Sequence, residues 1–218
     1  MDLRGRVINV LGDSITEGVG ASCQANRFTD VLWREYGLKA VNNYGISGSR
    51  IARQHVMTQE RHERWFSTRI AEMDPNADAV VVFGGTNDYG HGDAPLGAFD
   101  DRDDGSFYGA CHVLMKGLME KYVGKPILIL TPLHRLVEDD PHNERKAVGT
   151  IHPLSEYRRV LMEVAQYYAL PVLDLYATSG IQPQNEVCRQ RLCPDGLHPS
   201  DEGHAIIARR IGEMLKTL

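Results

Sequence analysis

The sequence predicts a three-layer α/β/α sandwich built around a five-stranded parallel sheet. Three observations support this fold class. Short apolar segments alternate with longer segments whose apolar residues recur at helical spacing. The alternation runs through the chain with no internal repeat or low-complexity linker. The length of 218 residues suits one substantial core, so we expect a single domain over residues 1–218.

Five short segments read as buried strands because they are apolar, rich in β-branched residues and followed by polar or glycine-rich loops. In chain order they are Arg6–Leu11, Lys39–Tyr44, Asp78–Phe83, Pro126–Leu130 and Pro171–Leu175. Strands that alternate with helices form right-handed crossover units, which make the sheet parallel and cover both of its faces.

The intervening segments carry apolar stripes at helical spacing. They are Phe28–Tyr36, the charged segment Thr58–Met73, Tyr108–Tyr122, Leu154–Tyr168 and the closing segment Ser200–Leu218. The last of these begins with an N-cap serine, followed by two acidic residues that favour the positive end of a helix.

Composition excludes several classes of function. Apolar residues make up 42% and charged residues 24% of the chain, and the net charge is −5. Without a basic stripe, nucleic acid is not an expected partner. The apolar runs are too short to span a membrane, and no signal peptide is visible at the N-terminus, so we expect a cytoplasmic protein. The sequence does not indicate an oligomeric state.

The four cysteines, Cys23, Cys111, Cys188 and Cys193, form no CxxC pair and no zinc spacing. Cys188 and Cys193 are close enough to bridge a short loop. Reduced thiols are the favoured interpretation because no export signal accompanies them.

Four glycine-supported polar loops are expected at one edge of the sheet. They read Gly12-Asp13-Ser14, Gly45-Ile46-Ser47-Gly48, Gly84-Gly85-Thr86-Asn87-Asp88 and Asp195-Gly196-Leu197-His198. Ligands of parallel sheets bind at the carboxyl ends of the strands. We therefore expect these loops to form one site.

The residue types in these loops are those that acyl transfer requires. Ser14 supplies a hydroxyl nucleophile, His198 a base, and Asp195, three residues earlier, a carboxylate that can orient the imidazole. The Gly48 N–H, the Asn87 side-chain amide and the Ser14 backbone N–H are the candidate donors to an oxyanion.

These blocks resemble the SGNH hydrolases, the superfamily of the GDSL-type esterases and lipases. The four marker residues correspond to Ser14 in GDSIT, Gly48 in NNYGISGS, Asn87 in GGTND and His198 in DGLHPS. All four occur in order over nearly the whole chain. GDSIT has isoleucine where the name-giving motif has leucine. The resemblance implies the flavodoxin-like SGNH hydrolase fold, ester hydrolysis without a cofactor or metal, and a catalytic triad of Ser14, Asp195 and His198. It also implies an oxyanion hole formed by Ser14, Gly48 and Asn87.

Other interpretations of the same motifs fit less well. The glycines after the first strand lack the spacing and the lysine of a phosphate-binding P-loop. No GxSxG elbow is present, and His62-Glu63 is not followed by the second histidine of an HExxH zinc motif. The aspartates of segment 89–106 do not follow the EF-hand register. We read Asp13 and Asp88 as residues that hold their loops, and His204 as a packing or surface residue.

The substrate is predicted from the loops that flank the expected site. Segments 89–106 and 133–153 are long and polar, and Tyr89, His91, His134 and Arg135 are candidate contacts with a small-molecule substrate. Polar walls suit a short acyl group on a polar alcohol, such as an acetylated carbohydrate. The alternatives are a lysophospholipase or thioesterase, and a non-catalytic carbohydrate-binding module on the same fold.

Overall fold

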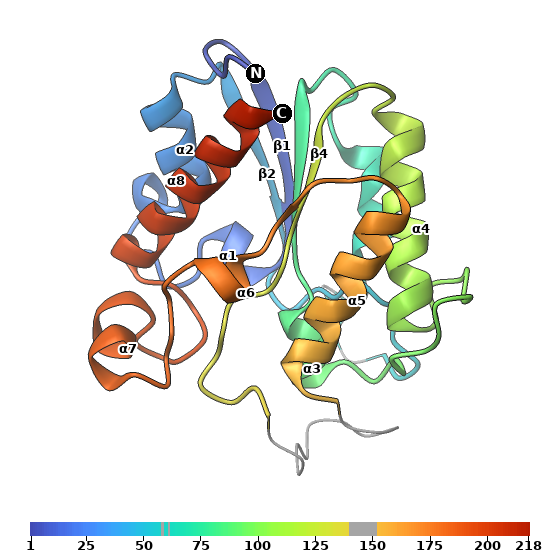
Figure 1. The fold of residues 1–218 in the computed structure, drawn as a ribbon. Helices are drawn as coiled ribbons and strands as arrows, with labels where there is room; N and C mark the ends of the chain where they lie inside the picture. Colours follow the sequence, from blue (N-terminus) through green and yellow to red (C-terminus); the bar gives the residue numbers. More distant parts are fainter. Residues whose placement is uncertain (58, 61, 140–151) are drawn as a thin grey trace.

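The protein, seen in a computed structural model, folds around one five-stranded parallel sheet with helices on both faces (Figure 1). The structure describes residues 1–57, 59–60, 62–139 and 152–218. The strand order is β2-β1-β3-β4-β5, the order of a flavodoxin-like sheet. The predicted fold class is confirmed.

The strands lie where the sequence predicts them, within one or two residues. They are β1 (Val7–Gly12), β2 (Ala40–Gly45), β3 (Ala79–Phe83), β4 (Ile127–Leu130) and β5 (Val172–Leu173). The register pairs Gly12 of β1 with Gly45 of β2 and with Phe83 of β3, so three strands end at the same level. The loops that follow them therefore begin side by side.

The long helices form the two outer layers. On one face lie α2 (Phe28–Tyr36) and α8 (Asp201–Thr217), and on the other lie α4 (Phe107–Lys121), α5 (Leu154–Tyr167) and the 3₁₀ helix η2 (Phe66–Glu72) (Figure 1). Neighbouring residues of a strand point to opposite faces. Accordingly, Val81 packs into the core beneath α2 and α8, whereas Val80 and Val82 pack into the core beneath α4 and α5.

Short helices lie mainly in the connections. They are α1 (Ser14–Glu17), the 3₁₀ helix η1 (Gln24–Asn26), α3 (Thr86–His91), α6 (Leu175–Thr178) and α7 (Glu186–Leu192). Both chain termini lie at the upper edge of Figure 1, and α1 and α3 lie toward the opposite edge, where β1 and β3 end. No helix in the described part of the chain is both long and apolar enough to span a membrane.

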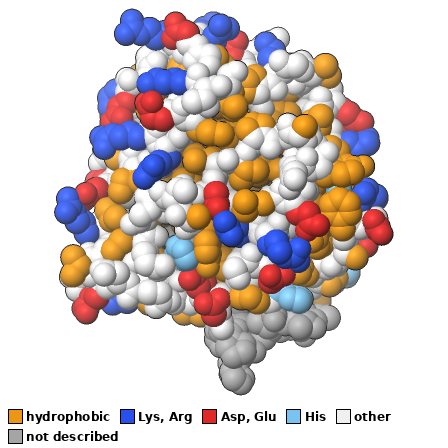
Figure 2. All heavy atoms as spheres, in the orientation of Figure 1, with side chains coloured by type: hydrophobic (Ala, Val, Ile, Leu, Met, Phe, Trp, Pro, Cys, Tyr) orange, Lys and Arg blue, Asp and Glu red, His pale blue; other side chains and the backbone are white. Residues whose placement is uncertain are grey.

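The surface charges are mixed, and the cysteines are unbridged. On the face drawn in Figure 2, acidic and basic side chains are interspersed, with no large area of one sign. All four cysteines are free thiols, including Cys188 and Cys193. The bridge considered between these two is therefore not formed.

Candidate active site

The proposed nucleophile lies at the start of the single-turn helix α1, directly after β1. Asp13 caps this helix by accepting a hydrogen bond from the Ile15 N–H at 3.0 Å, and Gly18 ends it in the left-handed conformation. Ser14 is 6% exposed. A Cβ on Gly45, at the end of β2, would lie 2.2 Å from the backbone nitrogen of Glu17. Glycine there lets α1 pack directly against the end of the neighbouring strand.

Ser14, His198 and Asp195 form one hydrogen-bonded chain. The Ser14 Oγ lies 3.1 Å from His198 Nε2, and His198 Nδ1 lies 2.7 Å from Asp195 Oδ2. The two ends of this chain come from opposite ends of the sequence, brought together by β1 and by the loop that precedes α8. The arrangement is that of a nucleophile, a base and a group that orients the base.

Asp195 is held by its own loop. Its Oδ1 accepts the backbone N–H groups of Leu197 and His198 at 2.8 and 2.6 Å. Partial burial disfavours the charged form, but the backbone N–H of His198, the His198 ring and the Leu197 N–H together hold the pKa of Asp195 below its usual value. The carboxylate is therefore ionised at neutral pH, as an orienting acid must be.

The turn that contains Gly48 is anchored to α1 and β1. Glu17 accepts hydrogen bonds from the Ser47 N–H and hydroxyl, and the Ile46 N–H donates to the Gly12 carbonyl. Gly48 has a φ of +77°, and a Cβ at this position would lie 2.4 Å from His62 Nε2. Both the left-handed backbone and the close imidazole require glycine.

Asn87 lies in the first turn of helix α3 and contacts the loop that contains Gly48. It is 5% exposed, and its Nδ2 donates to the Ser49 carbonyl at 3.0 Å. Its Oδ1 lies 3.1 Å from His91 Nε2, and His91 Nδ1 lies 3.1 Å from a guanidinium nitrogen of Arg50. The structure thus brings the loops of Ser14, Gly48, Asn87 and His198 together at one edge of the sheet.

The aspartates next to these residues hold backbone. Asp88 is buried and accepts the N–H groups of Ile51 and Ala52 at 3.0 and 2.9 Å. Burial raises the pKa of Asp88. Burial likewise raises the pKa of Asp13, to about 7. Both are the loop-holding residues that the sequence suggested.

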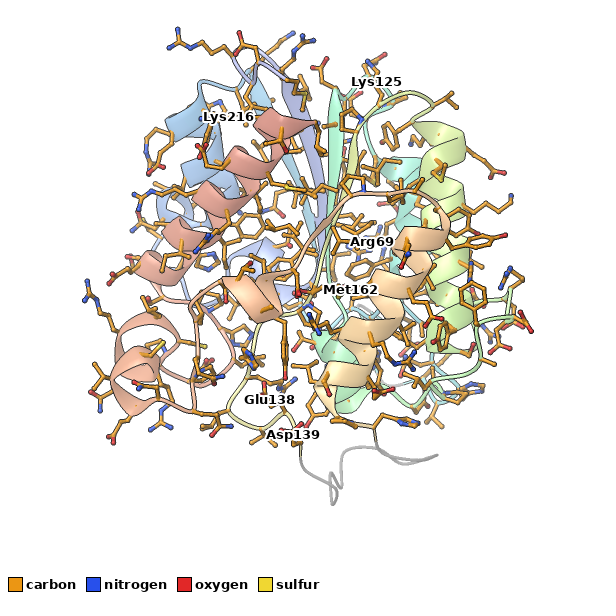
Figure 3. All side chains as sticks on the ribbon, in the orientation of Figure 1. Arg69, Lys125, Glu138, Asp139, Met162 and Lys216 are labelled. Carbon is orange, nitrogen blue, oxygen red and sulfur yellow. The ribbon has the colours of Figure 1, made fainter. Side chains whose placement is uncertain are left out.

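The four candidate substrate contacts have different surroundings. Tyr89 is 1% exposed and packs edge-to-face on Tyr157 in the core. The prediction that it contacts substrate is therefore wrong, because its buried ring is not accessible to a ligand. Arg135 is 8% exposed and donates to the Thr86 carbonyl and hydroxyl. His134 pairs with Glu138, which lies at the lower edge of the molecule (Figure 3).

His91 is the one candidate that contacts a residue of the proposed oxyanion hole. The part of segment 133–153 that contains His142 lies outside the described residues.

Aspartates of the acidic loop form hydrogen bonds and ion pairs with other residues of the protein. Asp101 accepts the Ser106 hydroxyl at 2.6 Å, and Asp104 pairs with Arg53 at 2.9 Å. Across the described ranges, no three His, Cys, Asp or Glu side chains are grouped so that they could hold a metal ion.

Three residues that sequence reasoning missed support this site. They are Glu17, which holds the Gly48 turn, Arg50, which contacts His91, and Arg69, which reaches the ends of β1 and β2. Arg50 and Arg69 are each 1% exposed. Arginine is rarely buried, so a single sequence gives no signal that would separate these two from surface arginines.

Comparison with known proteins places the chain in a family. The model of the GDSL-like Lipase/Acylhydrolase family matches residues 10–206. No curated protein sequence matches the chain.

Solved structures agree with this match. One with 32% sequence identity covers 100% of this chain and 99% of its own, with a TM-score of 0.84. A protein from Lactobacillus plantarum is 29% identical, covers 98% of each chain and has a TM-score of 0.83. The lipase/acylhydrolase from Enterococcus faecalis is 22% identical over 97% of this chain and 96% of its own, with a TM-score of 0.66, a likeness of fold.

Proposed function

This chain belongs to the GDSL-like lipase/acylhydrolase family, and we propose that it hydrolyses short-chain carboxylic esters through an acyl-enzyme on Ser14. Membership makes it a hydrolase of the SGNH type. The observation that carries the finer proposal is the hydrogen-bonded chain from Ser14 through His198 to Asp195.

The first half of the reaction forms the acyl-enzyme. His198 Nε2 takes the Ser14 proton as Oγ bonds to the ester carbonyl carbon, and Asp195 stabilises the resulting imidazolium. The carbonyl oxygen becomes an oxyanion, which accepts hydrogen bonds from the Ser14 N–H, the Gly48 N–H and the Asn87 amide. The carbon–oxygen bond to the alcohol then breaks, and the alcohol leaves with the proton from His198.

The second half repeats these steps with water. His198 removes a proton from water, whose oxygen bonds to the acyl carbon, and the second oxyanion uses the same donors. Collapse of this intermediate releases the carboxylic acid and returns the proton to Ser14. Substrate, water and the three side chains balance both halves, so the proposed cycle uses no cofactor.

Polar loops support a short acyl group on a polar alcohol, such as an acetylated carbohydrate. A specific observation favours the alternative of a longer acyl chain, as in a lysophospholipid or thioester. Leu136 and Val137 are 37% and 50% exposed, and the Leu136 N–H donates to the carbonyl of Gly196 in the triad loop at 2.7 Å. Leu136 therefore lies against the loop that carries Asp195 and His198, where its exposed side chain offers an apolar contact to an alkyl chain.

A panel of p-nitrophenyl esters from acetate to palmitate, together with acetylated sugars, tests the proposal. We expect the highest kcat/KM on acetate and butyrate, and no loss of rate after dialysis against EDTA, because N–H donors supply the charge stabilisation. Ser14→Ala should lower kcat by about 10⁶-fold. Ser67→Ala, in η2, is the matched control and should keep wild-type turnover.

Three results would contradict the proposal. If a Ser14→Ala protein with a native circular dichroism spectrum keeps a tenth of the turnover, Ser14 is not the nucleophile. A preference for long-chain esters would favour the lysophospholipase alternative. Carbohydrate binding without hydrolysis of any ester would favour the binding module.

A further inference from the structure

His91 contacts the amide oxygen of Asn87, whereas the amide nitrogen of Asn87 contacts Ser49. The imidazole is partly buried, and its two nitrogens contact two different residues, Arg50 and Asn87. Asn87 in turn contacts the Ser49 carbonyl. Together these groups form a single row of hydrogen bonds that ends beside the proposed oxyanion hole.

The direction of every hydrogen bond in this row is determined by its two ends. A guanidinium can only donate, so Arg50 must donate to His91 Nδ1. A neutral imidazole that accepts at Nδ1 carries its proton on Nε2, so His91 must donate to Asn87 Oδ1. At the far end a carbonyl can only accept, so the Asn87 Nδ2 group donates to Ser49.

The charges around His91 favour this neutral form. Burial, together with the positive charges of Arg50 and Arg135 and the neighbouring His62, lowers the pKa of His91 to about 4. At neutral pH the ring therefore carries one proton. The contact with Arg50 determines which nitrogen holds that proton.

The consequence concerns the amide of Asn87. Its Nδ2 has two hydrogens, and Ser49 takes one of them. A flipped amide would bring two acceptors together at Ser49 and two donors together at His91. The row of hydrogen bonds thus holds the second Nδ2 hydrogen in one direction, available to a substrate oxygen.

We propose that His91 is a positioning residue that holds the Asn87 amide in its donating orientation and is itself held in the Nε2–H tautomer by Arg50. This rests on the proposed function, in which Asn87 donates to the oxyanion. It also replaces the sequence-based reading of His91 as a direct substrate contact.

Substitution of His91 tests the proposal through the separation of kcat from KM. His91→Ala should lower kcat for p-nitrophenyl acetate by about tenfold, the equivalent of one net hydrogen bond, and leave KM unchanged. His91→Gln should recover most of kcat, because the glutamine amide can place an N–H near the position of Nε2. His55→Ala is the matched control. His55 is exposed and its ring contacts the Gly105 carbonyl, outside the proposed site, so kcat should not change.

A double-mutant cycle separates positioning from substrate contact. In an Asn87→Ala background, His91→Ala should have no further effect on kcat, because the group that it positions is gone. An equal loss of kcat in both backgrounds, or a rise in KM with unchanged kcat, would overturn the proposal. A residue that only stabilised the fold would lower the melting temperature and give no rescue by glutamine.

Nitrogen NMR of the wild-type protein gives a readout that does not depend on activity. We expect the His91 ring to be neutral and protonated at Nε2 at pH 7, and an Nδ1–H tautomer would overturn the proposal.

Labelling of Ser14 with a fluorophosphonate distinguishes failure of the His91 role from failure of the proposed esterase function. A wild-type protein that is labelled and active but fails the cycle refutes only the role of His91. If the wild type hydrolyses no ester and is not labelled, the proposed function fails and the role of His91 fails with it.

Discussion

Asp195, the proposed orienting acid of the triad, lies half open to solvent. Its side chain is 55% exposed, whereas that of His198 is 18% exposed. Water screens an exposed charge, so its Coulombic stabilisation of an imidazolium is modest. Three hydrogen bonds to its two oxygens nevertheless fix its direction. Orientation of His198 is therefore the larger part of its expected contribution.

Asp195→Asn should lower kcat by a factor of about 10²–10⁴, with the upper end of that range belonging to a buried triad acid. An amide in place of the carboxylate can present an N–H to His198 and favour the wrong tautomer. The kcat and KM of p-nitrophenyl acetate hydrolysis measure the effect, with circular dichroism as the check on folding. Turnover close to that of the wild type would mean that another group orients His198.

At this residue scale, the sequence predicted the candidate reacting groups and missed most of the residues that hold their loops. Ser14, Gly48, Asn87, Asp195 and His198 stand in recognisable blocks, and the structure brings their loops together. Glu17 and Arg50 act across the loops, and contacts between distant segments leave no local pattern in one sequence. Tyr89 was predicted to contact substrate, but its ring is buried in the core, and its place two residues after Asn87 does not reveal this burial.

At the scale of elements, long segments with an apolar period were predictable and single turns were not. The helix Phe28–Tyr36 has the predicted bounds, and α5 differs from its prediction by one residue. The helices α1, α3 and α6 have four to six residues, too few to show a period. The strand predicted to Leu175 ends at Leu173, because Asp174 caps α6. Among the described residues of the predicted helix Thr58–Met73, Phe66–Glu72 is helical, as a 3₁₀ helix, whereas Thr58 and Arg61 lie outside the described residues.

The packing of α8 against α2 depends on a buried histidine. His204 of α8 is fully buried, its Nδ1 accepts the Phe28 N–H, and its Nε2 donates to the Val19 carbonyl at 3.3 Å. This pair of bonds requires the neutral ring. Burial lowers the pKa of His204 to about 4. The sequence suggested a packing or a surface residue at His204, and the structure shows the packing residue.

Through His204, acidification should lower the free energy of unfolding. Between pH 6.5 and about 4 the unfolded chain protonates this histidine and the folded protein does not, so acidification stabilises the unfolded state. His204 alone should cost the wild type about 2 kcal/mol of unfolding free energy between pH 7.5 and pH 5. Asp13, whose raised pKa of about 7 gives the opposite sign in this range, reduces the total change.

A comparison of variants isolates the contribution of His204. His204→Asn should be less stable than the wild type at pH 7.5 but should lose about 2 kcal/mol less on acidification to pH 5. Urea unfolding at both pH values measures this difference, and the exposed His55→Asn is the control. Equal losses in the wild type and His204→Asn would show that His204 is not neutral in the folded protein at pH 5.

At the scale of the whole molecule, one buried arginine joins the strand ends on which the site is built. Arg69 of η2 lies in the interior (Figure 3). Its guanidinium donates to the carbonyls of Gly12 and Tyr44, at the ends of β1 and β2, and to the hydroxyl of Ser49. Burial lowers its pKa to about 10, which still leaves it charged at neutral pH. Gly12 is two residues before Ser14, and the Ser49 carbonyl accepts a hydrogen bond from Asn87, so Arg69 connects the segments of the proposed nucleophile and of a proposed oxyanion donor.

Arg69→Met should therefore affect stability and catalysis together. Methionine fills a similar apolar space, but it removes one donor from two carbonyls and a hydroxyl, and it removes a positive charge from the surroundings of Asp13. Loss of the donor to buried hydrogen-bond acceptors costs about 1–3 kcal/mol of unfolding free energy. The kcat for p-nitrophenyl acetate should also fall, because both the Ser14 and the Ser49 loops lose the same anchor.

Arg102→Met is the matched control, since Arg102 also lies over aromatic rings but is exposed. A surface change of this kind should stay within about 0.5 kcal/mol and leave kcat unchanged. Urea unfolding and ester hydrolysis on the same preparations test both parts. If Arg69→Met loses stability and keeps full kcat, the strand ends hold the catalytic loops without the arginine. If it loses neither, the hydrogen bonds from its guanidinium contribute nothing net to the fold. We expect both quantities to fall, because three segments that are distant in the sequence share this one side chain.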